Sequence, residues 1–321
     1  MFARLLTRPR PLLAHRTFAT TAARAAPARV ARQSVAPSAP LGVDAALDPT
    51  AASSPSPKIF DEFSLRGRVG LVTGAHRGLG LEMAVALAEA GARVYCVDIH
   101  KQPDEEWQRA KQYVGGMGDG RSLEYVQGDV TDQQGMWEVG DLVGEREGRL
   151  DVCVANAGVL KPGEDCLEYP ADTFDEVMKI NVNGVLYTAQ AGGRQMRRFQ
   201  KPGSIILIAS MSGSITNEGQ PWVSYNTSKS AVKQMARSMA CELASEGIRV
   251  NSLSPGYIYT KLTAAFLEPQ PELLAEWSSQ NPMGRLGRPD ELRGVITWLA
   301  SDASTFCTGS DIIVDGGHRA W

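Results

Sequence analysis

The sequence predicts an α/β fold in which a doubly wound parallel sheet of seven strands forms a single domain. From Arg68 onward, short apolar runs rich in Val and Ile alternate with longer amphipathic stretches, as strands alternate with helices around a parallel sheet. The chain of 321 residues is 43% hydrophobic and has no internal repeat. That composition is sufficient to bury one large core.

Seven segments have the length and composition of buried strands. In chain order they are RVGLVTG, RVYCVDI, LEYVQGDV, LDVCVANAG, SIILIAS, IRVNSLSPG and DIIVDGG, which begin at residues 68, 93, 123, 150, 204, 248 and 311. Helical patterns lie between most of them, over Leu79–Ala90, Phe174–Phe199 and Tyr225–Glu246. This order of strands and helices predicts crossover connections and a parallel sheet.

The first 43 residues have a different composition. They contain seven arginines, no lysine and no acidic residue before Asp44, amid Ala, Ser, Thr and Pro. This predicts a mitochondrial presequence and a place in the mitochondrial matrix. The alternative is an arginine-rich tail without a targeting role, which would leave the protein in the cytoplasm. Residues 44–57 are expected to form a disordered linker and residues 58–321 the folded domain.

Charge and cysteine content exclude several classes of function. Without the seven arginines of the leader, 26 basic residues face 36 acidic ones, so a nucleic-acid partner or an anionic membrane surface is not expected. Prolines and arginines interrupt the apolar run near Leu5 and Leu12, so no membrane span is expected. The five cysteines include no C-x-x-C pair and the four histidines no H-x-x-x-H. These spacings predict free thiols and no metal site.

A glycine-rich turn follows the first expected strand. TGAHRGLG runs from Thr73 to Gly80, and its glycines permit a tight turn that brings a pyrophosphate to a helix N-terminus. Asp98 ends the next strand, 18 residues beyond Gly80, where a carboxylate can accept hydrogen bonds from an adenosine ribose. Together they predict a dinucleotide site, although the spacing departs from G-x-G-x-x-G.

Further motifs follow in order along the chain: GDV (Asp129), NAG (Asn156–Gly158), NVNG (Asn181–Gly184), SMSG, YNTSK and SPGYIYT. From about Phe63 to Trp321 the sequence thus resembles the short-chain dehydrogenase/reductase family, which has a Rossmann-type fold. The resemblance implies a cofactor site that includes these residues: Gly74, Arg77, Gly78, Leu79, Gly80, Asp98, Asp129, Val130, Asn156, Gly158, Tyr225, Lys229, Pro255, Gly256, Ile258 and Thr260.

SYNTSK places Tyr225 and Lys229 four residues apart, on one face of a helix. The resemblance implies that Tyr225 exchanges a proton with the substrate oxygen and that Lys229 holds the nicotinamide ribose. A neighbouring ammonium is expected to lower the pKa of the phenol. Asn181 is expected to hold a water that relays protons to Lys229. His76 is expected to line an exposed phosphate turn without taking part in chemistry.

The family's substrate-polarising serine has two candidates. Ser210 ends the fifth expected strand and is followed three residues later by Gly213, as in the family, whereas the family's usual distance to the tyrosine selects Ser212. We expect Ser210, because the loop NEGQPWVS contains two additional residues.

Two signals on cofactor preference conflict. Asp98 accepts hydrogen bonds from a free 2′-hydroxyl and repels a 2′-phosphate, whereas Arg77 resembles residues that reach such a phosphate in NADP-dependent relatives. A phosphate beside a carboxylate is costly at low dielectric, so we expect NAD in preference to NADP.

The segment 256–289 contains two helix-prone pieces and is expected to close over the substrate. Aromatic and polar residues there and in the opposite loop suit a small hydroxylated substrate. ASMSGSITN, EYPADTFDEVMKINVNGVLY and the terminal DGGHRAW resemble fungal polyol dehydrogenases of this family, most closely the D-arabinitol 2-dehydrogenases that form D-ribulose. The resemblance implies reversible oxidation of a polyol to a ketose and a homodimer or homotetramer.

Two alternatives remain open. A mitochondrial 3-oxoacyl-carrier-protein reductase would share the fold and the four catalytic residues, but it should prefer NADPH and carry a basic patch for its carrier. A catalytically silent dinucleotide-binding protein would show no turnover with any alcohol.

Overall fold

The computed structural model describes residues 42–47, 58–161, 163 and 165–321. They belong to one compact unit, Ala36–Trp321, and a second unit, Met1–Val35, lies outside the described residues. Residues 1–41 of the predicted presequence also fall outside them. One turn of helix, α1 (Val43–Ala46), spans the expected boundary between the presequence and the linker.

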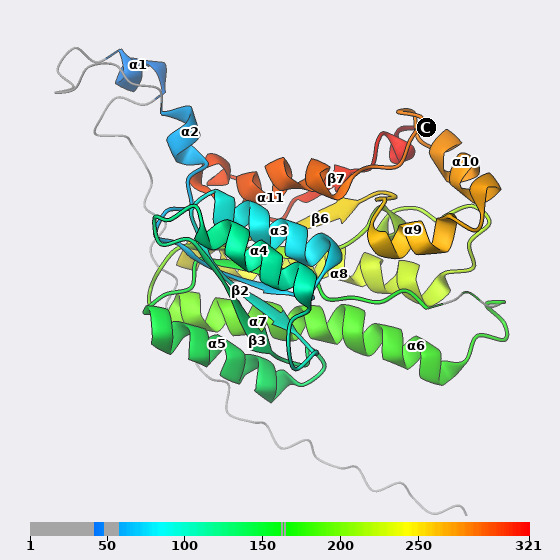
Figure 1. Ribbon diagram of the computed structural model, residues 1–321, viewed down its shortest axis with the longest axis horizontal. Coiled ribbons are helices and arrows are strands. Elements are labelled where there is room, and N and C mark those ends of the chain that lie inside the picture. The colour runs from blue at the N-terminus through cyan, green and yellow to red at the C-terminus, as the bar shows by residue number, and fades with distance from the viewer. Residues whose placement is uncertain (1–41, 48–57, 162, 164) are drawn as a thin grey trace, which may run out of the picture. The chain divides into compact units, whose positions relative to one another are not determined.

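Seven parallel strands form one sheet in the order β3-β2-β1-β4-β5-β6-β7, which confirms the predicted fold class (Figure 1). The strands are β1 (Val69–Thr73), β2 (Arg93–Asp98), β3 (Ser122–Gln127), β4 (Val152–Ala155), β5 (Gly203–Ile208), β6 (Ile248–Pro255) and β7 (Asp311–Val314). The order reverses between β1 and β4, and a doubly wound sheet binds its ligand at such a switch point.

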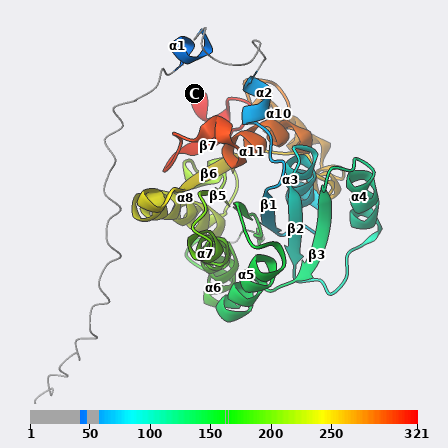
Figure 2. The same ribbon diagram turned by 90° about the vertical axis from the view of Figure 1, so that its left-hand side faces the viewer.

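Helices cover both faces of this sheet (Figure 2). The main ones are α2 (Ile59–Glu62), α3 (Gly78–Glu89), α4 (Glu105–Gly115), α5 (Gln133–Glu147), α6 (Ala171–Met178), α7 (Gly184–Arg198), α8 (Val223–Leu243), α9 (Lys261–Leu267), α10 (Pro271–Ser279) and α11 (Arg293–Ala300). One face packs against α3, α4 and α11, and the other against α5, α7 and α8.

Adjacent residues of a strand pack into different cores, one on each face of the sheet. In β1, Leu71 belongs to the core beneath α5, α7 and α8, whereas Val72 belongs to the core beneath α3 and α11. Both side chains are fully buried, because a strand that is covered on both faces buries every side chain. This explains why the central strands are continuous apolar runs in the sequence.

The edge strands are less buried than we predicted. Tyr125 and Val126 of β3 and all four residues of β7 are only partly buried, because each edge strand has a single neighbour and the helices do not fully cover it. β3 also ends at Gln127, earlier than predicted, so that Asp129 and Val130 lie in the loop that follows.

The helical pattern predicted over Phe174–Phe199 is interrupted. A π-helical turn, Lys179–Asn183, separates α6 from α7. Asn181 lies in this turn and is fully buried. Single π-helical turns inside longer helices often mark functional positions.

The segment 256–289 contains α9 and α10, as its two helix-prone pieces predicted. It begins directly after β6 and therefore lies at the carboxyl edge of the sheet, near the C-terminus of the chain (Figure 1). Its closure over a substrate stays a prediction. None of the helices that the structure describes is long and apolar enough to cross a membrane.

Candidate active site

The glycine turn after β1 is hydrogen-bonded to the residue that follows β4. Asn156 donates its side-chain amide to the carbonyls of Thr73 (3.0 Å) and Gly74 (3.2 Å), and the Thr73 hydroxyl accepts the backbone N–H of Asn156 at 3.2 Å. A β-carbon at Gly80 would lie 2.1 Å from the Gly74 carbonyl oxygen. The close approach of α3 to this turn therefore requires glycine at position 80.

The N-terminus of α3 fits the pyrophosphate of a dinucleotide. Among the described residues no side chain caps this helix, so its first N–H groups are available to an anion. Gly78 has a φ of 59°, and a β-carbon there would have no protein atom within 4 Å. The space beside the turn is thus clear of side chains.

Asp98 ends β2 and is paired. Its Oδ1 lies 2.7 Å from Nδ1 of His100, and its Oδ2 accepts the backbone N–H of His76 at 3.2 Å. His76 is 8% exposed, so its side chain is buried although Arg77 and Gly78 of the same turn are exposed. Its imidazole stacks on that of His100 at 4.5 Å between ring centroids and lies 3.3 Å from Asp104.

The other predicted cofactor residues surround the same edge of the sheet. Asp129 accepts the N–H of Thr131 at 2.8 Å, Ile258 forms a bridge with Gly287, and the Thr260 side chain caps α9. The remaining ones lie in the glycine turn or at the ends of β3, β4 and β6: Arg77, Leu79, Val130, Gly158, Pro255 and Gly256. Their contact with a cofactor stays a prediction.

The structure brings Ser210, Tyr225 and Lys229 together. The Ser210 hydroxyl lies close enough to the phenol of Tyr225 to lower the pKa of that phenol. The ammonium of Lys229 lies 5.6 Å from the centre of the Tyr225 ring and donates to the carbonyl of Ile208, the last residue of β5, at 2.9 Å. Lys229 is 4% exposed, so α8 holds a buried cation beside the phenol.

Burial dominates the pKa values of both groups. It lowers the pKa of Lys229 to about 8. It raises the pKa of Tyr225 above its usual value, and the neighbouring Ser210 hydroxyl opposes this shift. We expected Lys229 to lower the pKa of Tyr225. The structure shows the opposite net direction, because loss of water around the phenol outweighs its polar contacts.

Ser210 and Ser212 occupy different positions in one turn. Ser210 contacts Tyr225 and its hydroxyl also accepts the backbone N–H of Ser212 at 3.2 Å. A β-carbon at Gly213 would lie 2.7 Å from the backbone of Lys229, so glycine there allows the turn to pack on α8. These contacts favour Ser210, and its catalytic role stays a prediction.

Asn181 joins three elements through its side chain. Its amide group donates to the carbonyl of Val159 (2.8 Å) and to the hydroxyl of Ser228 (3.1 Å), and its Oδ1 accepts the N–H of Val159 at 2.8 Å. Asn181 thereby ties the loop after β4 to α8. Because these contacts use the amide N–H groups and one lone pair of Oδ1, a water on Asn181 would need the second lone pair of Oδ1 or the backbone.

Aromatic side chains from two segments meet beside Tyr225. Trp222 packs edge-on against Tyr225 (6.2 Å between centroids) and against Trp277 of α10 (6.1 Å). Trp277 stacks on Tyr257 at 4.2 Å, and the Tyr257 hydroxyl accepts the side-chain amide of Asn217 at 3.0 Å. Oδ1 of Asn217 and Nε1 of Trp277 are buried without a partner among the described residues.

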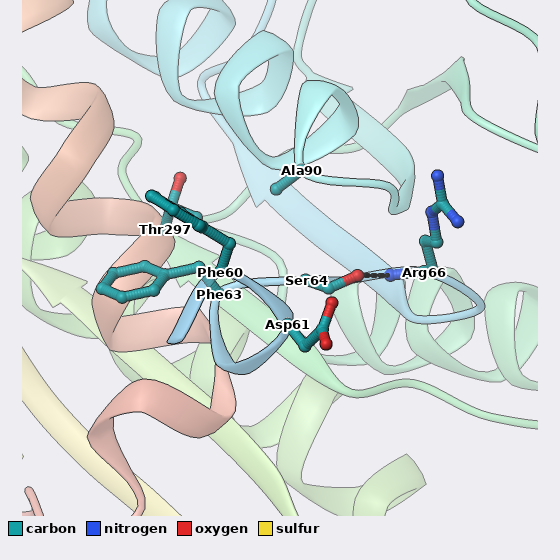
Figure 3. A pocket seen from close by; sticks show the side chains of 7 residues that line it. All are labelled: Phe60, Asp61, Phe63, Ser64, Arg66, Ala90 and Thr297. Atoms are coloured by element: carbon teal, nitrogen blue, oxygen red, sulfur yellow. Dashed lines mark hydrogen bonds between the residues drawn. The ribbon is translucent and has the colours of Figure 1, made fainter. Parts of the chain in front are cut away.

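A surface hollow of about 400 Å³ lies elsewhere (Figure 3). Its walls come from α2, from the loop before β1, from Ala90 at the end of α3, and from Thr297 of α11. It therefore lies toward the amino end of β1, and it contains none of the predicted site residues. The described residues contain no cluster of metal-ligating side chains.

Three polar residues of the site were not predicted from the sequence. Thr73 anchors the glycine turn, Ser228 binds Asn181, and His100 pairs with Asp98. Thr73 and Ser228 lie inside recognised motifs, where their hydroxyls could have drawn attention. His100 lies two residues beyond the end of β2, and no sequence motif predicts its contact with Asp98.

Together, a doubly wound sheet, a glycine turn at an uncapped helix N-terminus and a half-buried Tyr225 beside the buried Lys229 define a dinucleotide-dependent oxidoreductase. Residues 74–319 match the family described as Enoyl-(Acyl carrier protein) reductase. The chain belongs to the short-chain dehydrogenase/reductase family. It is an NAD(P)-dependent oxidoreductase that acts on CH–OH groups.

Two of the relatives are named for activity on a sugar or a polyol. The chain is 42% identical over 259 residues to sorbose reductase sou1 of Schizosaccharomyces pombe, with 80% of this chain and 97% of that protein covered. It is 36% identical over 275 residues to the ribulose-forming D-arabinitol 2-dehydrogenase of Candida tropicalis, with 82% and 96% covered.

Solved structures share the fold. A short-chain dehydrogenase/reductase from Mycobacterium marinum has a TM-score of 0.75 and 40% identity, with 82% of this chain and 100% of that chain covered. A gluconate 5-dehydrogenase from Burkholderia cenocepacia, solved with NADP and tartrate, has a TM-score of 0.74 and 31% identity, with 82% and 99% covered.

Proposed function

We propose that this protein interconverts a polyol and a ketose, with D-arabinitol and D-ribulose as the expected pair and NAD as the expected cofactor. One observation carries the proposal: the phenol of Tyr225 borders a cluster of aromatic rings that also contains a buried amide oxygen and a buried indole N–H. Such a wall suits a compact molecule with several hydroxyls. The sorbose reductase similarity makes sorbose the second candidate.

A bound nicotinamide dinucleotide would accept the hydride that leaves the alcohol carbon. The chain's own residues handle the proton. The phenolate of Tyr225 takes it from the substrate hydroxyl during oxidation, and the phenol returns it to the carbonyl oxygen during reduction. Ser210 holds that oxygen beside the phenol, because its hydroxyl already contacts Tyr225.

Lys229 and Asn181 support this step. The Lys229 ammonium is fixed by the Ile208 carbonyl, where it can bind ribose hydroxyls and favour the phenolate as Tyr225 loses its proton. Asn181 positions the loop after β4 through its two hydrogen bonds to the backbone of Val159. We retain the proton-relay water on Asn181 as part of the proposal, held by a backbone atom.

Substrate recognition would fall to Asn217 and Trp277. Each has a buried polar atom without a partner among the described residues, and an unpaired buried donor or acceptor is costly. A hydroxyl-rich substrate that satisfies these atoms recovers this cost, whereas an acyl chain leaves them unpaired.

The experiment is a substrate panel. We expect the protein to reduce NAD with D-arabinitol and to release D-ribulose, identified by chromatography, with sorbitol, xylitol, mannitol and L-sorbose as comparison compounds. Turnover of a 3-oxoacyl thioester with NADPH, and of none of the sugars, would favour a carrier-protein reductase instead. No turnover with any compound would favour the silent dinucleotide-binding protein.

A further inference from the structure

The carboxylate expected to select the cofactor already has partners from the protein. Oδ1 of Asp98 lies 2.7 Å from Nδ1 of His100, and Oδ2 accepts the backbone N–H of His76 at 3.2 Å. The Asp98 side chain is 12% exposed and that of His100 is 53% exposed. A group that approaches Asp98 from solvent therefore also meets the imidazole.

Neighbouring side chains hold His100 in this position. Its ring stacks on that of His76 with an angle of 19° between the planes. The hydroxyl of Tyr125 on β3 donates to the His100 carbonyl at 3.0 Å and lies 3.4 Å from Nδ1 of His76. Asp104, at the start of α4, lies 3.3 Å from Nε2 of His76. These neighbours thus hold His100 in contact with Asp98.

Acidic, basic and imidazole side chains surround this turn. Asp98 and Asp104 each face one imidazole. Arg77 is exposed in the glycine turn next to His76, and Lys101 is exposed next to His100. A lone carboxylate repels a 2′-phosphate. Here Nδ1 of His100 lies 2.7 Å from the carboxylate, and Arg77 adds positive charge in the glycine turn.

We propose that His100 is a specificity-determining residue that allows this protein to bind NADP as well as NAD. Protonation of its imidazole beside a bound 2′-phosphate would offset the charge of Asp98 and give that phosphate a cation, while Asp98 keeps free lone pairs for the 2′-hydroxyl of NAD. The inference rests on the dinucleotide chemistry of the family and not on the polyol proposal, so it stands or fails independently of the substrate.

The test is a titration of the full chain with NADH and NADPH, followed by the fluorescence of the reduced nicotinamide, so that no substrate is needed. We expect the unsubstituted protein to bind NADPH within about tenfold of NADH. We expect His100→Gln, which keeps a hydrogen-bond donor but no charge, to weaken NADPH binding about tenfold and NADH binding less than about twofold, a difference of about 1.4 kcal/mol.

Two further variants make the result specific. His100→Arg restores a cation and is expected to recover NADPH binding, and Lys101→Gln removes a neighbouring cation and is expected to leave the ratio of the two Kd values unchanged. The proposal is overturned if the unsubstituted protein fails to bind NADPH, if His100→Gln weakens both cofactors equally or neither, or if Lys101→Gln lowers NADPH affinity as much as His100→Gln does.

Discussion

Lys229 carries its charge in the protein interior, where its ammonium donates to the Ile208 carbonyl. Burial lowers its pKa from 10.5 to about 8, so the charged form is destabilised by folding. Between these two pKa values the unfolded chain keeps a proton that the folded protein has lost. The contribution of Lys229 to the free energy of unfolding therefore rises with pH over that range.

This predicts that Lys229→Met stabilises the fold while it removes activity. At pH 7 the substitution removes a desolvation cost of about 3 kcal/mol, offset in part by the lost hydrogen bond. We expect a higher free energy of unfolding in urea at pH 7 and a smaller gain at pH 10. A variant that is less stable than the unsubstituted protein at both pH values would contradict the assigned cost of burial.

The two serines provide a matched pair. Ser210 contacts the phenol of Tyr225, whereas Ser212 contributes its backbone N–H to Ser210. We expect Ser210→Ala to lower kcat by about 100-fold or more, and Ser212→Ala to change it less than about threefold, because that substitution leaves the backbone donor in place. Steady-state kinetics would decide between them, and the reverse ranking would reassign the serine.

The identities of the catalytic residues could be predicted from ordered motifs, but their environments could not. The sequence placed Tyr225 and Lys229 on one helix face, yet the direction of the Tyr225 pKa shift depends on how much of the phenol is buried. The pairing of Asp98 with His100 depends likewise on a stacked neighbour, His76, from another loop. Such contacts are set by tertiary packing.

At the scale of elements, α10 brings Trp277 onto Trp222 and Tyr257. We expect Trp277→Phe to raise KM for the polyol about threefold to tenfold, since it keeps much of the ring packing and removes the indole N–H. Affinity for NADH, measured by fluorescence, should stay unchanged. If the substitution weakens NADH binding to the same degree, α10 serves the cofactor site and the assignment to the substrate is wrong.

The elements themselves were largely predictable, because period and length determine them when both faces of a sheet are covered. The departures have local causes. β3 and β7 are less buried than expected because they are edge strands. The helix predicted over Phe174–Phe199 contains a π-helical turn at Asn181, whose side chain bonds to Val159 and Ser228. A helical period carries no signal of that tertiary contact.

At the scale of the whole molecule, the leader and the folded domain are separate predictions. We propose that residues 1–43 direct the protein to the mitochondrial matrix, on the strength of seven arginines and no acidic residue. A reporter fused to residues 1–43 should enter isolated mitochondria and become resistant to external protease. The same reporter with these arginines changed to glutamine should stay outside, and equal import of both would argue against a presequence.

The central claim is that Tyr225 performs proton transfer for oxidation of a polyol by a nicotinamide dinucleotide. The most direct measurement is the absorbance of the reduced nicotinamide after the full chain is mixed with D-arabinitol and NAD. The variant Tyr225→Phe is measured under the same conditions. We predict turnover by the unsubstituted protein, a loss of about 1,000-fold or more in kcat for the variant, and an unchanged Kd for NADH. Equal turnover by both proteins would contradict the account.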